Sequence, residues 1–253
     1  MSEQFRIRVH WGPRRESAVD CAHKVSRTMT ALAALDPMLE RWFLLDRKGF
    51  VPVALDDVAT VAKTLEYQQK KLADGPVIPE EGFPLHSRTN RRDPFEIAVD
   101  YDVGAFGMFP YFPNRVTLIS QPLEPANASF VNLRLFKPAI LALSTIWNAN
   151  WAYAHPDGLP DLLPRDRRRM VSAFYGGWLT YLSPAFASKI VPPRSVICEE
   201  APGGGLLMIA TTDTFDIRNS AHVAVARDVC AALAPLNALP FPPNDTADGL
   251  ARP

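Results

Sequence analysis

Apolar and polar residues alternate strictly from position 5 to position 11, with apolar side chains at the odd positions and Arg6, Arg8 and His10 at the even ones. This period of two predicts a half-buried strand whose outer face is basic. A Gly-Pro pair ends the strand, and apolar residues then recur at helical spacing from about 15 to 35. The chain is therefore expected to open with a strand followed by an amphipathic helix.

The same two periods predict the other elements of the chain. Residues 74–94 are expected to form a long polar loop, and 165–182 fits a helix or a strand equally. Further strands are expected at 38–45, 95–106, 115–120, 129–136, 149–156, 195–201 and 206–212, the last two joined as a hairpin. Further helices are expected at about 55–72, 137–148 and 217–236.

These elements predict an α+β fold with mainly antiparallel sheet packed against a few long helices, because the strands cluster and alternate in the antiparallel manner. Residues 1–253 are expected to form one compact unit, with the Pro-, Asp- and Gly-rich stretch 240–253 as a frayed tail. A similar order of elements recurs in the second part of the chain. An alternative is therefore a pair of degenerate halves, 1–104 and 105–239, each containing a β-α-β arrangement.

Composition argues against several classes of protein. Lys plus Arg equals Asp plus Glu at 27 each, so no overall field favours nucleic acid or an anionic membrane. The 3 cysteines lack a Cys-x-x-Cys spacing, which argues against a disulfide framework and a zinc ribbon. The sequence shows no secretory signal and no apolar run near the ~18 residues that span a bilayer. We therefore expect a cytoplasmic protein without a cofactor that binds neither nucleic acid nor membrane.

Reactive side chains are densest at 9–25, where histidine, cysteine and acidic residues fall close together. Each helical residue advances about 100°, so Asp20 and His23 point away from the apolar stripe and Cys21 lies at its edge. The chain also lacks a His-x-x-x-His spacing. A solvated helix face is therefore favoured over a metal or nucleophilic site. Cys198, whose acidic neighbours would raise a thiol pKa, is interpreted as a buried strand cysteine.

Carboxylates form an acidic stripe along one face of the strand expected at 95–106. The stripe consists of Glu96, Asp100 and Asp102. It serves solubility in the simpler interpretation, and in the functional one it presents negative charge to a basic protein surface. Glu199 and Glu200 are adjacent and must lie on opposite faces of their strand, so at most one of them can join a flat patch.

Aromatic residues cluster in the stretch WNANWAYAH at 147–155, where they could stack bases or sugars or form core. Core is favoured because Trp151 and Tyr153 share one strand face. Asn150 and His155 are kept as candidate surface contacts. The arginine group at 165–169 is interpreted as the solvated start of an element, because the chain has no net charge to favour phosphate.

Several segments resemble the bacterial family known as immunity protein 52. The resemblance covers most of the chain, and its motifs are structural more than chemical. It is carried by the Trp-Gly turn and the PRRESA helix start at 11–18, Trp42-Phe43, DYDVGAFG at 100–107 and FVNLRL at 130–135.

The resemblance implies a cytoplasmic antitoxin of a type VI secretion or polymorphic toxin system, encoded beside a toxin with a restriction-endonuclease-like nuclease domain. Such a protein binds the toxin and blocks its active site or substrate channel. On this basis the candidate toxin contacts are Glu96, Asp100, Asp102, Glu199, Glu200, Arg6, Arg8, His10, Asn150 and His155. The alternative is a small hydrolase or metal-dependent enzyme in which histidines converge only in three dimensions.

Overall fold

Ten strands form one antiparallel sheet in the computed structural model, which describes residues 4–69, 75–90, 97–107, 113–121, 130–163 and 174–237. Their order across the sheet is β3-β2-β4-β5-β6-β1-β7-β8-β10-β9. The strands are β1 (Phe5–Trp11), β2 (Trp42–Asp46), β3 (Gly49–Val53), β4 (Phe83–Arg88), β5 (Ile97–Val103), β6 (Asn114–Ser120), β7 (Trp151–Pro156), β8 (Leu179–Leu182), β9 (Ile197–Ala201) and β10 (Gly205–Ile209). The prediction of mainly antiparallel sheet is confirmed.

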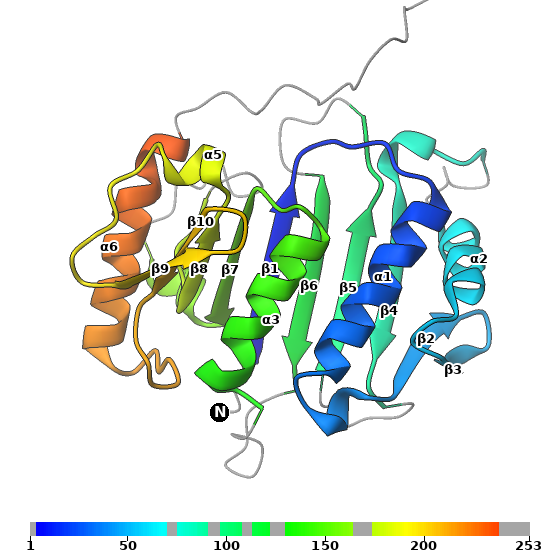
Figure 1. Cartoon of the computed structure of the whole chain (residues 1–253), viewed down its shortest axis with the longest axis horizontal. Helices are drawn as coiled ribbons and strands as arrows, with labels where there is room; N and C mark the ends of the chain where they lie inside the picture. The colour runs from blue at the N-terminus through cyan, green and yellow to red at the C-terminus, as the bar shows by residue number, and fades with distance from the viewer. Residues whose placement is uncertain are drawn as a thin grey trace, which may run out of the picture.

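Helices pack on both faces of this sheet. The helices in the described part of the chain are α1 (Ala18–Ala33), α2 (Val58–Gln68), α3 (Leu133–Ile146), α4 (Leu159–Leu162), α5 (Pro184–Ala187) and α6 (Ser220–Asn237). Figure 1 shows α1 and α3 side by side across one face of the sheet. Helix α3 packs against β1, and α2 packs against α1 and β4. The apolar residues that β1 was predicted to bury lie in this core, including Ile7 and Val9 at 0% exposure.

A second apolar cluster lies at the β7 end of the opposite face. Trp151 and Tyr153 of β7 pack there with Val229 and Leu233 of α6. The expectation that these two aromatic side chains belong to a core is confirmed, since their exposed fractions are 3% and 5%. On β4, β5, β6 and β1 this opposite face carries mostly polar side chains, together with Pro84, Ala98 and Ile119.

The strand predicted at 129–136 is wrong, because α3 already begins at Leu133. The side-chain oxygen of Asn132 accepts a hydrogen bond from the backbone N–H of Leu135 at 3.0 Å, which caps the helix. Around this cap, apolar and polar residues alternate over a few positions, as they would in a strand. The buried residues from Leu135 to Leu143, in contrast, follow helical spacing.

The polar loop expected at 74–94 is also incorrect in part, because it contains β4. Pro84 argues against a central strand, since proline cannot donate a ladder hydrogen bond. The pairing of β2 with β4 involves only Ser87 and Arg88 on the β4 side, so the Pro84 end of β4 lies beyond that pairing. Pairing with β5 extends along all of β4.

The alternative of two degenerate halves is not confirmed. The sheet continues across the division near residue 104, because β5 pairs with β6. In addition, β1 lies between β6 and β7 and pairs with both. The first strand of the chain therefore lies in the middle of the sheet, and residues from both proposed halves build that sheet. The frayed tail expected at 240–253 lies outside the described residues.

Candidate functional site

Most of the side chains singled out in the sequence gather on one face of the sheet, opposite α1 and α3. The strand order β4-β5-β6-β1-β7 places them in rows, because each residue faces its partner in the register. One row joins Asp100, Thr117 and Arg8, and the next joins Asp102, Arg115 and His10. We call this surface the polar face; it consists of Arg6, Arg8, His10, His86, Asp100, Asp102, Arg115 and Thr117.

The acidic stripe is not a free row of carboxylates. Asp100 accepts a hydrogen bond from His86 Nδ1 at 2.8 Å, and Asp102 pairs with Arg115 at 2.5 Å. This hydrogen bond to Asp100 also raises the pKa of His86. Glu96 lies outside the described residues. The stripe predicted as negative is therefore part of a surface on which neighbouring strands supply opposite charge.

The three polar residues of β1 lie in different environments. Arg6 forms a bidentate pair with Asp157, with N–O distances of 2.5 and 2.9 Å. Arg8 donates to the hydroxyl of Tyr153 at 3.4 Å. His10 is half-buried and stacks on Trp151 with ring centroids 4.8 Å apart. Burial, with the nearby Arg115 and Arg8 charges, lowers the pKa of His10 to about 3.

Two of the predicted contact residues, Asn150 and His155, make contacts within the fold. His155 is 3% exposed and stacks on Tyr153, so burial lowers its pKa to about 4. Asn150 accepts a hydrogen bond from the backbone N–H of Gly12 at 3.0 Å, while its own backbone N–H donates to the carbonyl of His10. Asn150 therefore fixes the turn after β1.

The two glutamates of β9 point to opposite faces, as predicted. Glu199 pairs with Lys137 of α3 at 2.5 Å, on the helix-covered side of the sheet. Glu200 is exposed, and neither residue belongs to the polar face. The expectation of a buried Cys198 is wrong, because β9 is an edge strand and leaves this thiol exposed.

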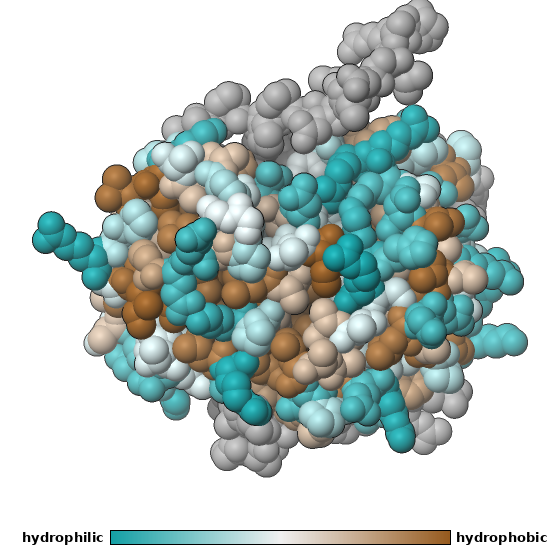
Figure 2. Space-filling view, in the orientation of Figure 1, coloured by the Kyte–Doolittle hydropathy of each residue, from teal (hydrophilic) through white to brown (hydrophobic). Residues whose placement is uncertain are grey.

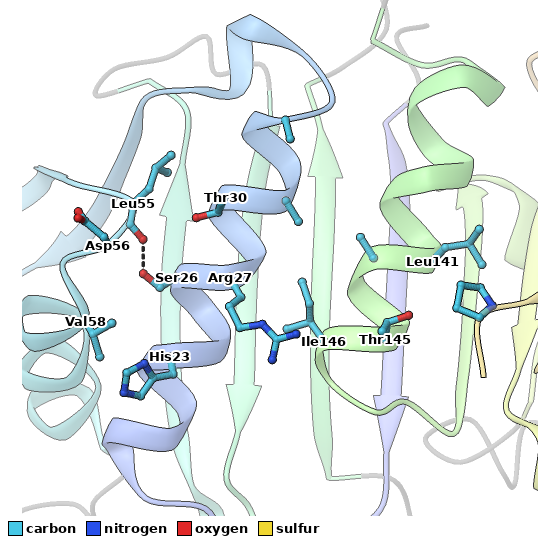
Figure 3. A pocket seen from close by; sticks show the side chains of 14 residues that line it. His23, Ser26, Arg27, Thr30, Leu55, Asp56, Val58, Leu141, Thr145 and Ile146 are labelled. Carbon is cyan, nitrogen blue, oxygen red and sulfur yellow. Dashed lines mark hydrogen bonds between the residues drawn. The ribbon is translucent and has the colours of Figure 1, made fainter.

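A groove of about 720 Å³ runs between α1 and α3 on the other face of the sheet. Small and apolar side chains such as Ala31, Ala34 and Leu141 line it, and Figure 3 shows Arg27 extending from α1 toward Ile146. Figure 2 shows apolar side chains among the charged ones on this helix-covered face. Sequence reasoning missed the groove because several elements contribute to it, although the exposed small residues of α1 were a signal.

The reactive group at 9–25 disperses as predicted. Asp20 and His23 are exposed on α1, whereas Cys21 is fully buried and its burial raises the thiol pKa to about 12. In the described part of the chain, no group of three His, Cys, Asp or Glu residues is placed to hold a metal ion. His10 and His155 share one face of the sheet, and the ring of Tyr153 stacks against both.

His86 and Arg115 complete the polar face and were not predicted as site residues. Arg115 begins a strand that the sequence predicts, but its pairing with Asp102 depends on which strands are neighbours. His86 was hidden by the assignment of its segment to a loop. The arginine group at 165–169 lies outside the described residues. None of the helices that the structure describes is long and apolar enough to cross a bilayer.

The fold is similar to that of the Pseudomonas aeruginosa T6SS protein PA0821. That structure is 11% identical, has a TM-score of 0.50, and the match covers 90% of this chain and 73% of that one. The substrate-free duplicated taurocyamine kinase of Schistosoma mansoni matches with 11% identity and a TM-score of 0.28, over 92% of this chain and 33% of that chain. No curated protein matches the sequence.

A family model described as Immunity protein 52 matches residues 3–239. The chain belongs to this family, as its sequence motifs suggested. The match extends from the start of β1 to the end of α6, so it includes the whole described sheet.

Proposed function

We propose that this protein binds a cognate bacterial toxin directly and blocks it, and that it acts in the cytoplasm as the antitoxin of a type VI secretion or polymorphic toxin system. The toxin is a nuclease whose active site or DNA channel is covered. The observation that carries the proposal is the match of an immunity-protein family model to residues 3–239. The fold shared with a T6SS protein of Pseudomonas supports the same context.

The polar face suits a nuclease partner in its chemistry. A nuclease binds phosphates through a basic groove, and carboxylates of an inhibitor can occupy such a groove. Asp100 and Asp102 already have partners, but their side chains are 38% and 27% exposed. Exposed ion pairs contribute only about 0.2–1 kcal/mol, so exchanging His86 or Arg115 for a cation of the toxin costs little.

The first experiment tests the complex itself. The chain is co-expressed with the toxin encoded beside its gene, and the pair is purified through a tag on one partner. We expect an equimolar complex with nanomolar or tighter affinity and survival of the producing cells. Death of cells that make the folded protein would contradict the proposal. If the toxin forms the complex but does not cleave DNA when it is free, only the assignment of the toxin as a nuclease is wrong.

The second experiment tests the polar face. Asp100→Lys together with Asp102→Lys is expected to weaken toxin binding at least tenfold and to leave the protein folded, because two carboxylates become cations opposite a basic groove. Binding is measured by calorimetry and folding by circular dichroism.

The matched control changes the same charge elsewhere. Glu40→Lys together with Asp213→Lys alters two exposed carboxylates outside the polar face and is expected to keep full affinity. If the polar-face pair binds normally while Ala34→Arg in the α1–α3 groove abolishes binding, the toxin docks on the helices and the polar face only maintains solubility.

A further inference from the structure

A small pocket adjoins the polar face where β1 and β7 meet the segment after β7. Its volume is about 150 Å³. Arg8, Tyr153, His155 and Tyr175 are the polar residues of its lining, and Leu159 and Leu163 are among the apolar ones. The backbone carbonyl of Tyr175 accepts a hydrogen bond from Trp151 Nε1 at 3.2 Å, which holds the remaining wall against β7.

Arg8 brings an unbalanced charge to this pocket. Its neighbours on the polar face are matched, since Arg6 pairs with Asp157 and Arg115 pairs with Asp102. The guanidinium of Arg8 is half-buried and donates to Tyr153 at 3.4 Å, but among the described residues no carboxylate pairs with it. A partly desolvated cation without an anion is unfavourable, so the position favours binding of an anion.

The other polar groups of the pocket are oriented by the fold. Because the hydroxyl oxygen of Tyr153 accepts from Arg8, its proton is free to be donated to a ligand. His155 lies 2.7 Å from the carbonyl of Pro156 through Nδ1, so Nδ1 carries the proton of the neutral ring. Arg8 Nε is buried, and the described residues offer this donor no hydrogen-bond partner.

We propose that this pocket binds a carboxylate group, which is held by the guanidinium of Arg8 and the hydroxyl of Tyr153. A planar carboxylate matches two parallel donors of a guanidinium better than a single charge does. At ~30 Å³ per water molecule, the pocket corresponds to about five waters, which is enough for acetate or the end of an acidic side chain. This inference concerns the isolated chain and holds whichever toxin it binds.

The binding experiment uses sodium acetate as the probe and acetamide as its neutral isostere. The folded full chain is titrated at pH 7 and constant ionic strength while the Arg8 side-chain and Tyr153 signals are followed by NMR. We expect saturable shifts with a millimolar dissociation constant for acetate, because so small a ligand supports only weak binding. Acetamide is expected to bind at least tenfold more weakly, and equal affinities, or no saturation with acetate, would overturn the proposal.

Two substitutions on β1 distinguish specific binding in the pocket from a general effect of positive charge on this face. Arg8→Gln is expected to abolish acetate binding, whereas Arg6→Gln, with the same charge change on the same face, is expected to stay within twofold of the wild type. Arg8→Lys keeps the charge without the paired donors and should weaken binding about tenfold; it replaces Arg8→Gln if that variant fails to fold. Wild-type affinity in a folded Arg8 variant would refute the assignment.

The source of the carboxylate is tested with a second probe. Aspartate blocked at both its amino and carboxyl groups presents the same group on a peptide unit. Binding of both probes assigns the pocket to an acidic side chain of a protein partner, and binding of acetate alone assigns it to a small free acid. Failure of both probes contradicts the carboxylate site altogether.

Discussion

His10 and His155 pack against the ring of Tyr153 on one face of the sheet, and burial keeps both imidazoles neutral at pH 7. Their pKa values of about 3 and about 4 lie below the usual 6.5. The unfolded chain therefore binds more protons than the folded chain between about pH 4 and 6.5. By linkage, stability rises with pH across this window and is lost as the pH falls.

Replacing His10 by Phe is expected to reduce this acid sensitivity. Phe keeps a ring on Trp151 and removes the proton site, so the loss of unfolding free energy between pH 6.5 and 4.5 should shrink by about 1–2 kcal/mol. Urea unfolding at the two pH values measures this difference. His23→Phe alters an exposed histidine of α1 and should keep the wild-type pH dependence; identical dependence in all three proteins would contradict the assignment.

At the scale of elements, the spacing of apolar residues and the positions of glycine and proline predict much of the fold. The faces of β1 and β5, the helix at α1 and the β9–β10 hairpin all follow from alternation, helical spacing and glycine position. The errors arise where one residue outweighs the pattern. Asn132 caps a helix within a run that alternates like a strand, and Pro84 lies in a strand although proline argues against one.

The cap of α3 has a measurable contribution. Asn132→Ala removes the acceptor for the Leu135 backbone N–H and is expected to lower the free energy of unfolding by about 1 kcal/mol. Asn132→Asp keeps that acceptor and should lie close to the wild type. Chemical denaturation of the three proteins gives the comparison, and equal losses in both variants would show that the amide acts through other contacts.

At the scale of the whole molecule, the candidate site depends on strand order, which the sequence does not reveal. Asp102 and Arg115 lie on the consecutive strands β5 and β6, whereas His10 joins their row only because β1 lies between β6 and β7. The sequence predicts which side chains share a face of each strand, but it does not predict which strands lie next to each other. The charge pairs of the polar face were therefore invisible until the topology was known.

A continuous sheet leads us to expect one cooperative unit. Leu32 lies in the large cluster under α1, and Leu233 lies in the second cluster under α6. Leu32→Ala and Leu233→Ala should each lower the unfolding free energy by about 2–5 kcal/mol and shift the same single transition. Scanning calorimetry tests this, and two separate transitions in either variant would indicate independently folding parts.

The sheet ends at β3 on one side and at β9 on the other. Edge strands expose backbone groups that can recruit another chain. Pro52 removes one donor from β3, and Glu199 and Glu200 place charge on β9. The proline and the charged side chains of the two outermost strands thus protect the sheet against edge-to-edge pairing with another copy of the chain.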